Sequence, residues 1–265
     1  MTSPSLLLKN MSLIIKKNTT FRIPRTPFLP SSLGGLALWL KADAGVTLAG
    51  SNVTAWEDQS GNGENATTEN GGADSPIFVS SAQNSNPAIQ FNNSALDGAS
   101  FMRIASPAFN LKNSTAFFVA KQINQIVFAR LFAFLPASGE DYNSNDGLAV
   151  VYNNTTDPRQ FQIESNSGGA FENASNYEAF GVASYTITSG GLITPFFNSI
   201  AGTTHTNADM ASTNGADALI AQGSQFLGGS SFDGQIAEIV IYSRVLTTPE
   251  RQQVEAYLNS KYQIY

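Results

Sequence analysis

The acidic residues of this chain have the wrong spacing for glycoside hydrolysis. A retaining glycosidase holds two carboxyl groups about 5 Å apart, on the same side of the substrate. Glu57-Asp58 and Glu140-Asp141 are adjacent pairs, so a strand would point their side chains to opposite faces. Glu238 stands alone in an apolar run, where we expect a buried and paired acid. Hydrolysis is therefore the least favoured function, and we predict that the chain is not an enzyme.

A polar loop after Trp56 is the best candidate for a metal site. Its oxygen-bearing residues follow the spacing of a twelve-residue calcium loop, namely Asp58, Ser60, Asn62, Gly63 and Glu69. Ser60 replaces a stronger ligand, however, and no helices flank the loop. The same residue types are also typical of tight turns. We assign no metal ligand here, and calcium binding stays an open alternative.

Other sources of chemistry are scarce in the sequence. His205 is the single histidine and there is no cysteine, so neither a histidine-rich metal centre nor a thiolate site is available. No Gly-x-Ser-x-Gly elbow is present. Residues 61–66 match a dinucleotide fingerprint formally, but the chain continues as loop where that motif requires a helix. We predict no catalytic residue and no cofactor.

Aromatic side chains beside amides are the remaining lead, because flat rings and amides are typical of sugar-binding surfaces. Four tyrosines lie near asparagines in sequence: Tyr142, Tyr152, Tyr177 and Tyr185, with Asn143, Asn145, Asn153 and Asn176. The competing interpretation is that the rings fill the core, as aromatic residues generally do. Trp39 and Trp56 are expected in the core.

Short apolar runs separated by turn residues predict an all-β protein. We expect strands near residues 36–41, 77–80, 88–91, 116–122, 131–135, 148–152, 161–164, 182–188, 192–197 and 232–243. So many strands are best accommodated in two stacked antiparallel sheets. The body, residues 34–265, is predicted to be one domain.

The last strand and the helix after it are the most informative stretch. Alternation predicts Ile236, Val240 and Tyr242 on one face, and Ala237, Ile239 and Ile241 on the other, so both faces are covered. A helix is predicted to follow, with Thr248 as its cap and Pro249 in its first turn. The apolar residues of this helix recur at helical spacing: Val254, Tyr257, Leu258 and Tyr262.

The first 33 residues differ from the body in charge and composition. Residues 1–30 hold five bases and no acid, whereas the rest holds nine bases and twenty acids. Pro24, Pro27 and Pro30 resist helix formation. We predict an extended basic and apolar arm, residues 1–33, that docks on another protein. No signal peptide or membrane-spanning run is expected, and the acidic body argues against nucleic acid as a partner.

Several blocks of this sequence resemble one superfamily. Residues 38–46, 56–63 and 232–258 are similar to the laminin-G-like branch of the concanavalin A-like lectin/glucanase superfamily, and residues 87–92, 117–121 and 226–229 agree with it. The resemblance spans residues 36–262 and implies a two-sheet jelly-roll β-sandwich with one C-terminal helix. That superfamily includes binding modules, enzymes and particle proteins.

Together these features predict a non-catalytic structural protein of a phage particle, such as a capsid decoration, a head fibre or a tail adhesin. Its arm, residues 1–33, would bind other particle proteins, and its sandwich would bind cell-surface glycans. A homo-oligomer without membrane insertion is expected. The alternative is a free carbohydrate-binding module of a bacterial surface or secreted system.

Overall fold

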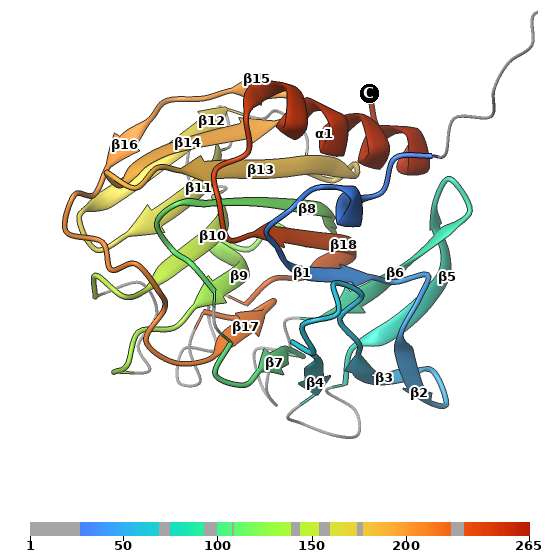
Figure 1. Cartoon of the computed structure of the whole chain (residues 1–265). Coiled ribbons are helices and arrows are strands. Elements are labelled where there is room, and N and C mark those ends of the chain that lie inside the picture. Colours follow the sequence, from blue (N-terminus) through green and yellow to red (C-terminus); the bar gives the residue numbers. More distant parts are fainter. Residues whose placement is uncertain are drawn as a thin grey trace, which may run out of the picture.

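The protein is nearly all β, with one α-helix, as the computed structural model shows (Figure 1). The structure describes residues 27–68, 75–92, 100–107, 109–138, 144–153, 160–173, 177–223 and 231–265. Several residues considered above lie outside these ranges: Glu69, Glu140, Asp141, Tyr142, Asn143, Asn176 and most of the arm.

The elements follow one another along the chain with short connections. The strands are β1 (Leu36–Lys41), β2 (Val46–Ala49), β3 (Asn52–Trp56), β4 (Ala66–Thr68), β5 (Ile77–Gln83), β6 (Asn86–Phe91), β7 (Met102–Ile104), β8 (Ser114–Gln122), β9 (Ala129–Phe134), β10 (Leu148–Asn153), β11 (Gln160–Ser165), β12 (Gly168–Asn173), β13 (Gly181–Ile187), β14 (Leu192–Phe197), β15 (Ile200–Ala201), β16 (His205–Thr206), β17 (Ala218–Ile220) and β18 (Gly234–Tyr242). The helices are the 3-10 helix η1 (Pro30–Ser32) and α1 (Thr248–Tyr262).

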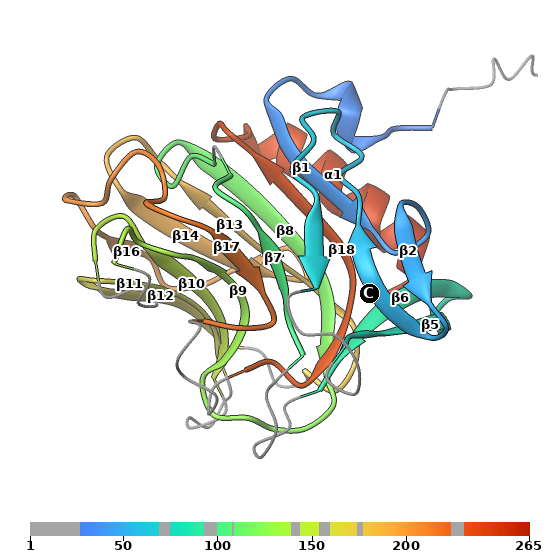
Figure 2. The same ribbon diagram turned by 90° about the horizontal axis from the view of Figure 1, so that it is seen from below.

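The strands pair in two antiparallel runs. One run is β5–β6–β18–β8–β13–β14, with β1 beside the second half of β18. The other is β2–β3–β4–β7–β17–β9–β10–β11–β12. A pairing between β3 and β5 joins the runs, and an isolated bridge between Phe171 and Thr203 links β12 to the segment that follows β15. The described strands therefore form one continuous antiparallel sheet, almost closed like a barrel, whose two halves face each other as in a β-sandwich (Figure 2).

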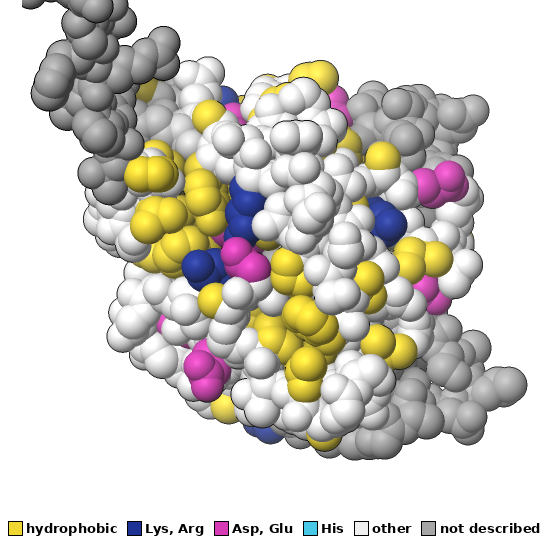
Figure 3. Space-filling view, turned by 90° about the vertical axis from the view of Figure 1, so that its right-hand side faces the viewer, with side chains coloured by type: hydrophobic (Ala, Val, Ile, Leu, Met, Phe, Trp, Pro, Cys, Tyr) yellow, Lys and Arg dark blue, Asp and Glu magenta, His cyan; other side chains and the backbone are white. Residues whose placement is uncertain are grey.

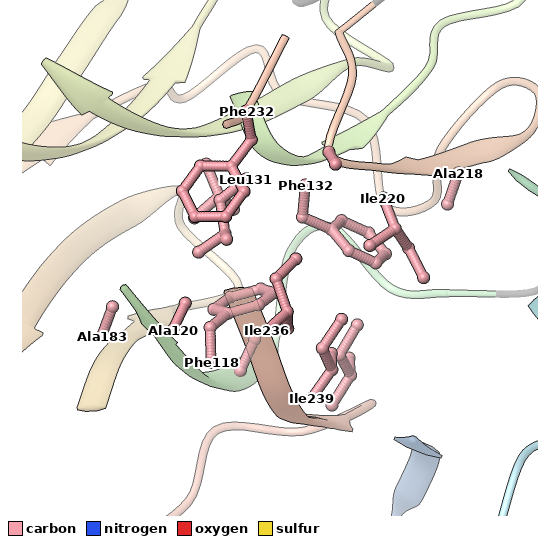
Figure 4. Close-up of a cluster of buried hydrophobic side chains, with 14 of the residues drawn as sticks. Phe118, Ala120, Leu131, Phe132, Ala183, Ala218, Ile220, Phe232, Ile236 and Ile239 are labelled. Carbon is pink, nitrogen blue, oxygen red and sulfur yellow. The ribbon is translucent and has the colours of Figure 1, made fainter. Parts of the chain in front are cut away.

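The main core fills the space between the two halves. Phe118 on β8 and Phe132 on β9 face each other with ring centroids 5.7 Å apart. Ile236 and Ile239 of β18 pack beside them, and Phe232 and Leu131 approach from the other half (Figure 4). Each such fully buried side chain stabilises the fold by about 1.5–3 kcal/mol. This core positions both outer faces of the molecule.

Helix α1 covers the outer face of the first half (Figure 1). Val254, Leu258 and Tyr262 recur at the predicted spacing and are buried against Trp39 and Val240. The N-cap is Thr247, one residue before the predicted Thr248, because Glu250 accepts hydrogen bonds from the Thr247 amide and hydroxyl, both at 2.8 Å. No helix in the described part of the chain is long and apolar enough to span a membrane.

A β-bulge in β18 corrects the predicted facing of that strand. The pairing with β8 shifts register between Ile236 and Glu238. As a result Ile236 joins Ile239 and Ile241 in the main core, whereas Ala237, Val240 and Tyr242 face the helix. The prediction that both faces are covered is confirmed. The grouping of Ile236 with Val240 and Tyr242 is wrong, because a bulge inserts one residue into the alternation.

Candidate functional site

The outer face under α1 contains a buried acid whose partners are all structural. Glu238 has no exposed surface. It accepts hydrogen bonds from Trp39 Nε1 at 2.7 Å, Tyr257 OH at 3.0 Å and Tyr262 OH at 2.9 Å. Lys261 Nζ lies 2.8 Å from its Oε2 atom. The expectation of a paired buried acid is confirmed, and this acid joins the helix to β18 and β1.

Burial changes the pKa values of the two tyrosines that contact Glu238. It raises the pKa of Tyr262 far above its ordinary value, and the Glu238 carboxylate beside the hydroxyl adds to that shift. The pKa of Tyr257 is raised for the same two reasons. Both hydroxyls therefore stay protonated and donate to Glu238. This face is closed and offers no room for a ligand at the acid.

The loop after Trp56 uses its polar atoms to hold itself against β1. Asp58 accepts hydrogen bonds from the Trp39 amide at 2.9 Å and from Ser60 Oγ at 2.6 Å. Asn62 Nδ2 donates to the Leu36 carbonyl at 2.9 Å. The described part of this loop thus behaves as a tight turn, and Glu69 lies outside the described residues. No group of three acidic or histidine side chains gathers anywhere in the described ranges.

Of the four tyrosines considered as sugar platforms, the three in the described residues lie in the core, and Tyr142 lies outside those residues. Tyr152, Tyr177 and Tyr185 are at most 1% exposed. Tyr152 stacks on Tyr177 with ring centroids 4.4 Å apart, and burial raises the pKa of Tyr152 and of Tyr185. The competing interpretation, core packing, is therefore confirmed for these three residues, and the alternation of β10 and β13 turns Tyr152 and Tyr185 inward. Trp39 and Trp56 are buried, as predicted.

The outer face of the second half has a different character. Phe161 and Ile163 of β11 face the main core, so Gln160, Gln162 and Glu164 project from the opposite side. The pairing register adds side chains from the neighbouring strands. We call this set the outer polar face: Arg130 of β9, Asn153 of β10, Gln160, Gln162 and Glu164 of β11, and Phe171 of β12.

The amides of the outer polar face form a chain of hydrogen bonds. Asn153 Nδ2 donates to Gln162 Oε1 at 3.2 Å, and Gln162 Nε2 donates to Gln160 Oε1 at 2.5 Å. Asn153 and Gln162 are 2% and 8% exposed. Each of these side chains is fixed by its neighbour, so the row presents amide donors and acceptors in a defined order across the strands.

The Glu164 carboxylate occupies the space that a side chain at position 169 would need. A Cβ atom at Gly169 would lie 2.7 Å from both carboxylate oxygens of Glu164. The Glu164 carboxylate therefore lies directly over β12, next to the half-buried ring of Phe171. Amides, a carboxylate and a flat ring on one surface suit hydrogen bonding to hydroxyl groups and stacking on an apolar sugar face.

His205 lies at the same end of the molecule, on β16. Its Nε2 atom is 3.1 Å from Ser167 Oγ in the turn between β11 and β12, and its ring packs over Gly168. Among the described residues no carboxylate hydrogen-bonds to this imidazole, so the triad geometry of a serine hydrolase is not formed there. The contact joins the turn to β16.

Comparison with solved structures shows proteins that share this fold. No protein-family model matches the sequence, and no curated protein is significantly similar to it. Domain 4 of the extracellular arabinanase AbnA from Geobacillus stearothermophilus, solved with arabinotriose, is similar with a TM-score of 0.61 at 14% identity. That match covers 84% of this chain and 97% of the domain.

Toxin binding domains are similar as well. The binding domain of Paraclostridial Mosquitocidal Protein 1 matches with a TM-score of 0.57 at 14% identity over 88% of this chain. The binding domain of botulinum neurotoxin serotype D matches with a TM-score of 0.56 at 13% identity over 84%. This chain spans about half of each, 53% and 51%. At such low identity the likeness shows a shared β-sandwich fold.

Sequence reasoning missed most of the outer polar face. Of the residues considered earlier only Asn153 belongs to it, and Asn145 lies elsewhere, where it accepts a hydrogen bond from Asn166 at 3.4 Å. One signal was present: Gln160, Gln162 and Glu164 alternate with apolar residues, as expected for a strand with one polar face.

Proposed function

We propose that this chain is a non-catalytic β-sandwich that binds glycans on its outer polar face. The observation that carries the proposal is the ordered row of Asn153, Gln162 and Gln160 beside the Phe171 ring. Amide donors and acceptors fixed in place before binding lose little entropy when they meet sugar hydroxyls. The similarity to the AbnA domain solved with arabinotriose supports this proposal.

The carboxylates of the outer polar face support binding without catalysis. Glycoside hydrolysis needs two carboxyl groups on one side of the substrate. In the described segments of β9 to β12, Glu164 is the one carboxylate that projects from this face, because Glu172 pairs with Phe161 and lies on the opposite side. Burial raises the pKa of Glu172. We propose that the chain turns over no glycan.

Glycan binding is tested with an alanine substitution in the amide row. We expect Gln162→Ala to weaken binding on a glycan array and in calorimetry by about ten-fold, since it removes the central donor and acceptor. Gln252→Ala on the exposed side of α1 is the matched control and should bind as the unaltered chain does. The proposal is overturned if the unaltered chain binds no glycan.

We further propose that the arm anchors the protein on a phage particle, as one of its structural proteins. The observation that favours an arm is how residues 27–30, where the described chain begins, contact the body. Phe28 packs edge-on against Tyr257 of α1, with centroids 6.4 Å apart, and Tyr242 OH donates to the Pro30 carbonyl at 2.9 Å. An open apolar groove of ≈ 720 Å³ lies between Pro27–Leu29 and the helix (Figure 3). The basic sequence 1–26 precedes Pro27, which lines this groove.

A truncation separates the two roles. The shortened chain should begin at Pro27, because Phe28 and Pro30 belong to the packed body. We expect it to fold, to bind glycans unchanged, and no longer to co-sediment with particles. Light scattering of both chains tests the accompanying proposal of a homo-oligomer. If truncation changes neither particle binding nor assembly, the alternative, a free carbohydrate-binding module on a bacterial surface or in a secreted system, is favoured.

A further inference from the structure

Lys261, in the last turn of α1, holds its amine between two carboxyl groups. Its Nζ atom lies 2.8 Å from Glu238 Oε2 and 3.0 Å from Asp43 Oδ1. The two acids differ in their surroundings, because the Glu238 side chain has no exposed surface whereas the Asp43 side chain is 35% exposed. A primary amine therefore contacts one fully buried carboxylate and one carboxyl group that solvent can reach.

Aromatic side chains enclose the buried part of this group. Three ring donors bond to the Glu238 carboxylate, namely Trp39 Nε1, Tyr257 OH and Tyr262 OH. Lys261 Nζ also lies 5.1 Å from the ring centroid of Tyr262 and 6.0 Å from that of Tyr257. These rings exclude water from the inner side of the amine and fix the Glu238 carboxylate against it.

The backbone fixes the other two members of the group. Asp43 belongs to the short connection between β1 and β2, where the Ala44 amide donates to the Lys41 carbonyl at 3.1 Å. The Lys261 carbonyl accepts a hydrogen bond from Asn86 Nδ2 at 2.9 Å. Groups held in contact in this way react as though each were present at about 10⁵–10⁸ M.

We infer that Lys261 and Asp43 form an intramolecular isopeptide bond, with Glu238 as the acid–base catalyst. Glu238 Oε2 accepts protons from Nζ, which frees the lone pair that attacks Asp43 Cγ, and returns them to the departing Asp43 oxygen. A C–N bond forms and a C–O bond breaks. Two of the three ammonium protons leave with that oxygen as water, so the reaction needs no oxidant or co-reactant.

The bond would give this protein a covalent constraint that its sequence otherwise lacks. It would join the end of α1 to the β1–β2 connection and close a ring from residue 43 to residue 261. The chain has no cysteine, so no disulfide can provide such a ring. A cross-link of this kind restricts the unfolded chain and locks the helix over its sheet. The inference is independent of glycan binding.

The experiment is the intact mass of the full chain, folded, purified and then denatured. We expect a mass one water below that of the sequence, and a digest in which the peptides of Asp43 and Lys261 are joined. Lys261→Arg keeps a cation between the two carboxylates but has no nucleophilic amine, so it should have its full sequence mass. Asp43→Asn should form the same bond with loss of ammonia in place of water, and its final mass should equal that of the linked unaltered chain.

A time course separates the role of Glu238 from that of the linked pair. The chain is refolded from urea, and its mass is followed at neutral pH. Glu238→Gln keeps an acceptor for Trp39 and Tyr257 but cannot take a proton from Lys261, so the bond should form about 10²-fold more slowly or less. Lys112→Arg is the matched control, because Lys112 Nζ contacts the Ala208 carbonyl and no carboxylate is involved in that bond. It should lose water as the unaltered chain does.

Three results would overturn the inference. A folded unaltered chain with its full sequence mass excludes the bond. A mass deficit that persists in Lys261→Arg places the lost water elsewhere in the chain. Bond formation in Glu238→Gln at the unaltered rate contradicts catalysis by Glu238. The masses of Lys261→Arg and Asp43→Asn decide the question even if Glu238→Gln does not fold.

Discussion

The two outer faces of this sandwich are both formed by antiparallel strands, but they differ in polarity and in whether the helix covers them. Over β1, β18, β8 and β13 the face is apolar, and α1 closes it with Leu258 and Tyr262. Over β9 to β12 the face carries Asn153, Gln160 and Gln162, which bond to one another, whereas α1, the one α-helix of the described residues, packs on the other face.

The difference shows how a buried polar group serves stability on one face and recognition on the other. Glu238 accepts hydrogen bonds from four donors of its own chain, so its carboxylate stabilises the fold and is not available to a ligand. The outer polar face instead carries the neutral amides Asn153, Gln160 and Gln162, whose donors and acceptors are of the kind that pair with sugar hydroxyls. Substitutions on the first face should therefore alter stability alone, and those on the second should alter binding.

The largest effect is expected at the closed face. Glu238→Ala should lower the free energy of unfolding by about 3–5 kcal/mol, because it leaves Trp39 Nε1 and two tyrosine hydroxyls without their carboxylate acceptor and Lys261 with Asp43 alone. Urea denaturation measures the loss. Glycan affinity of the folded fraction should not change. A loss below about 1 kcal/mol would contradict the structural role of this acid.

Overpacking the core should have the next largest effect. A Cβ atom at Gly181 would lie 2.3 Å from Cζ of the buried Phe197 ring. Gly181→Ala should therefore cost about 1–3 kcal/mol of unfolding free energy, with glycan affinity unchanged. Thermal and urea denaturation test this. Unaltered stability would mean that Phe197 moves aside without cost.

The matching glycine of the outer polar face should behave in the opposite way. Gly169→Ala would displace the flexible end of the half-buried Glu164 side chain and no backbone atom. We expect stability within about 0.5 kcal/mol of the unaltered chain, together with weaker glycan binding. Calorimetry and urea denaturation on one sample decide this. A large loss of stability with normal binding would reverse the contrast between the two faces.

Acid should loosen the start of α1 by protonating Glu250. The Arg244 guanidinium, with the Thr247 amide and hydroxyl, lowers the pKa of Glu250 from 4.5 to about 2. This contribution to stability is complete above pH 4.5 and is lost as the pH falls toward 2. Glu250→Gln should remove that part of the pH dependence. Circular dichroism of the two chains between pH 5 and 2 tests it; identical curves would contradict it.

Local pattern was sufficient to predict most of the fold. All ten predicted strands are present, as is the helix with Val254, Leu258 and Tyr262 on its buried side. The shorter or less apolar strands were not predicted, β12 among them, because Gly168-Gly169-Ala170 carries little β propensity. Strong alternation is visible in one strand's own residues, whereas weak strands form because neighbours supply their hydrogen bonds.

The sequence by itself determined an all-β body, its closing helix and the buried tryptophans, since each depends on apolar residues recurring at a fixed local period. Tertiary structure decided which polar residues meet. Asn153, Gln162 and Phe171 come from separate strands, and pairing register alone places them on one face. The bulge that reversed Ile236 is likewise a product of pairing with β8. Register depends on contacts between distant segments, and no local period encodes it.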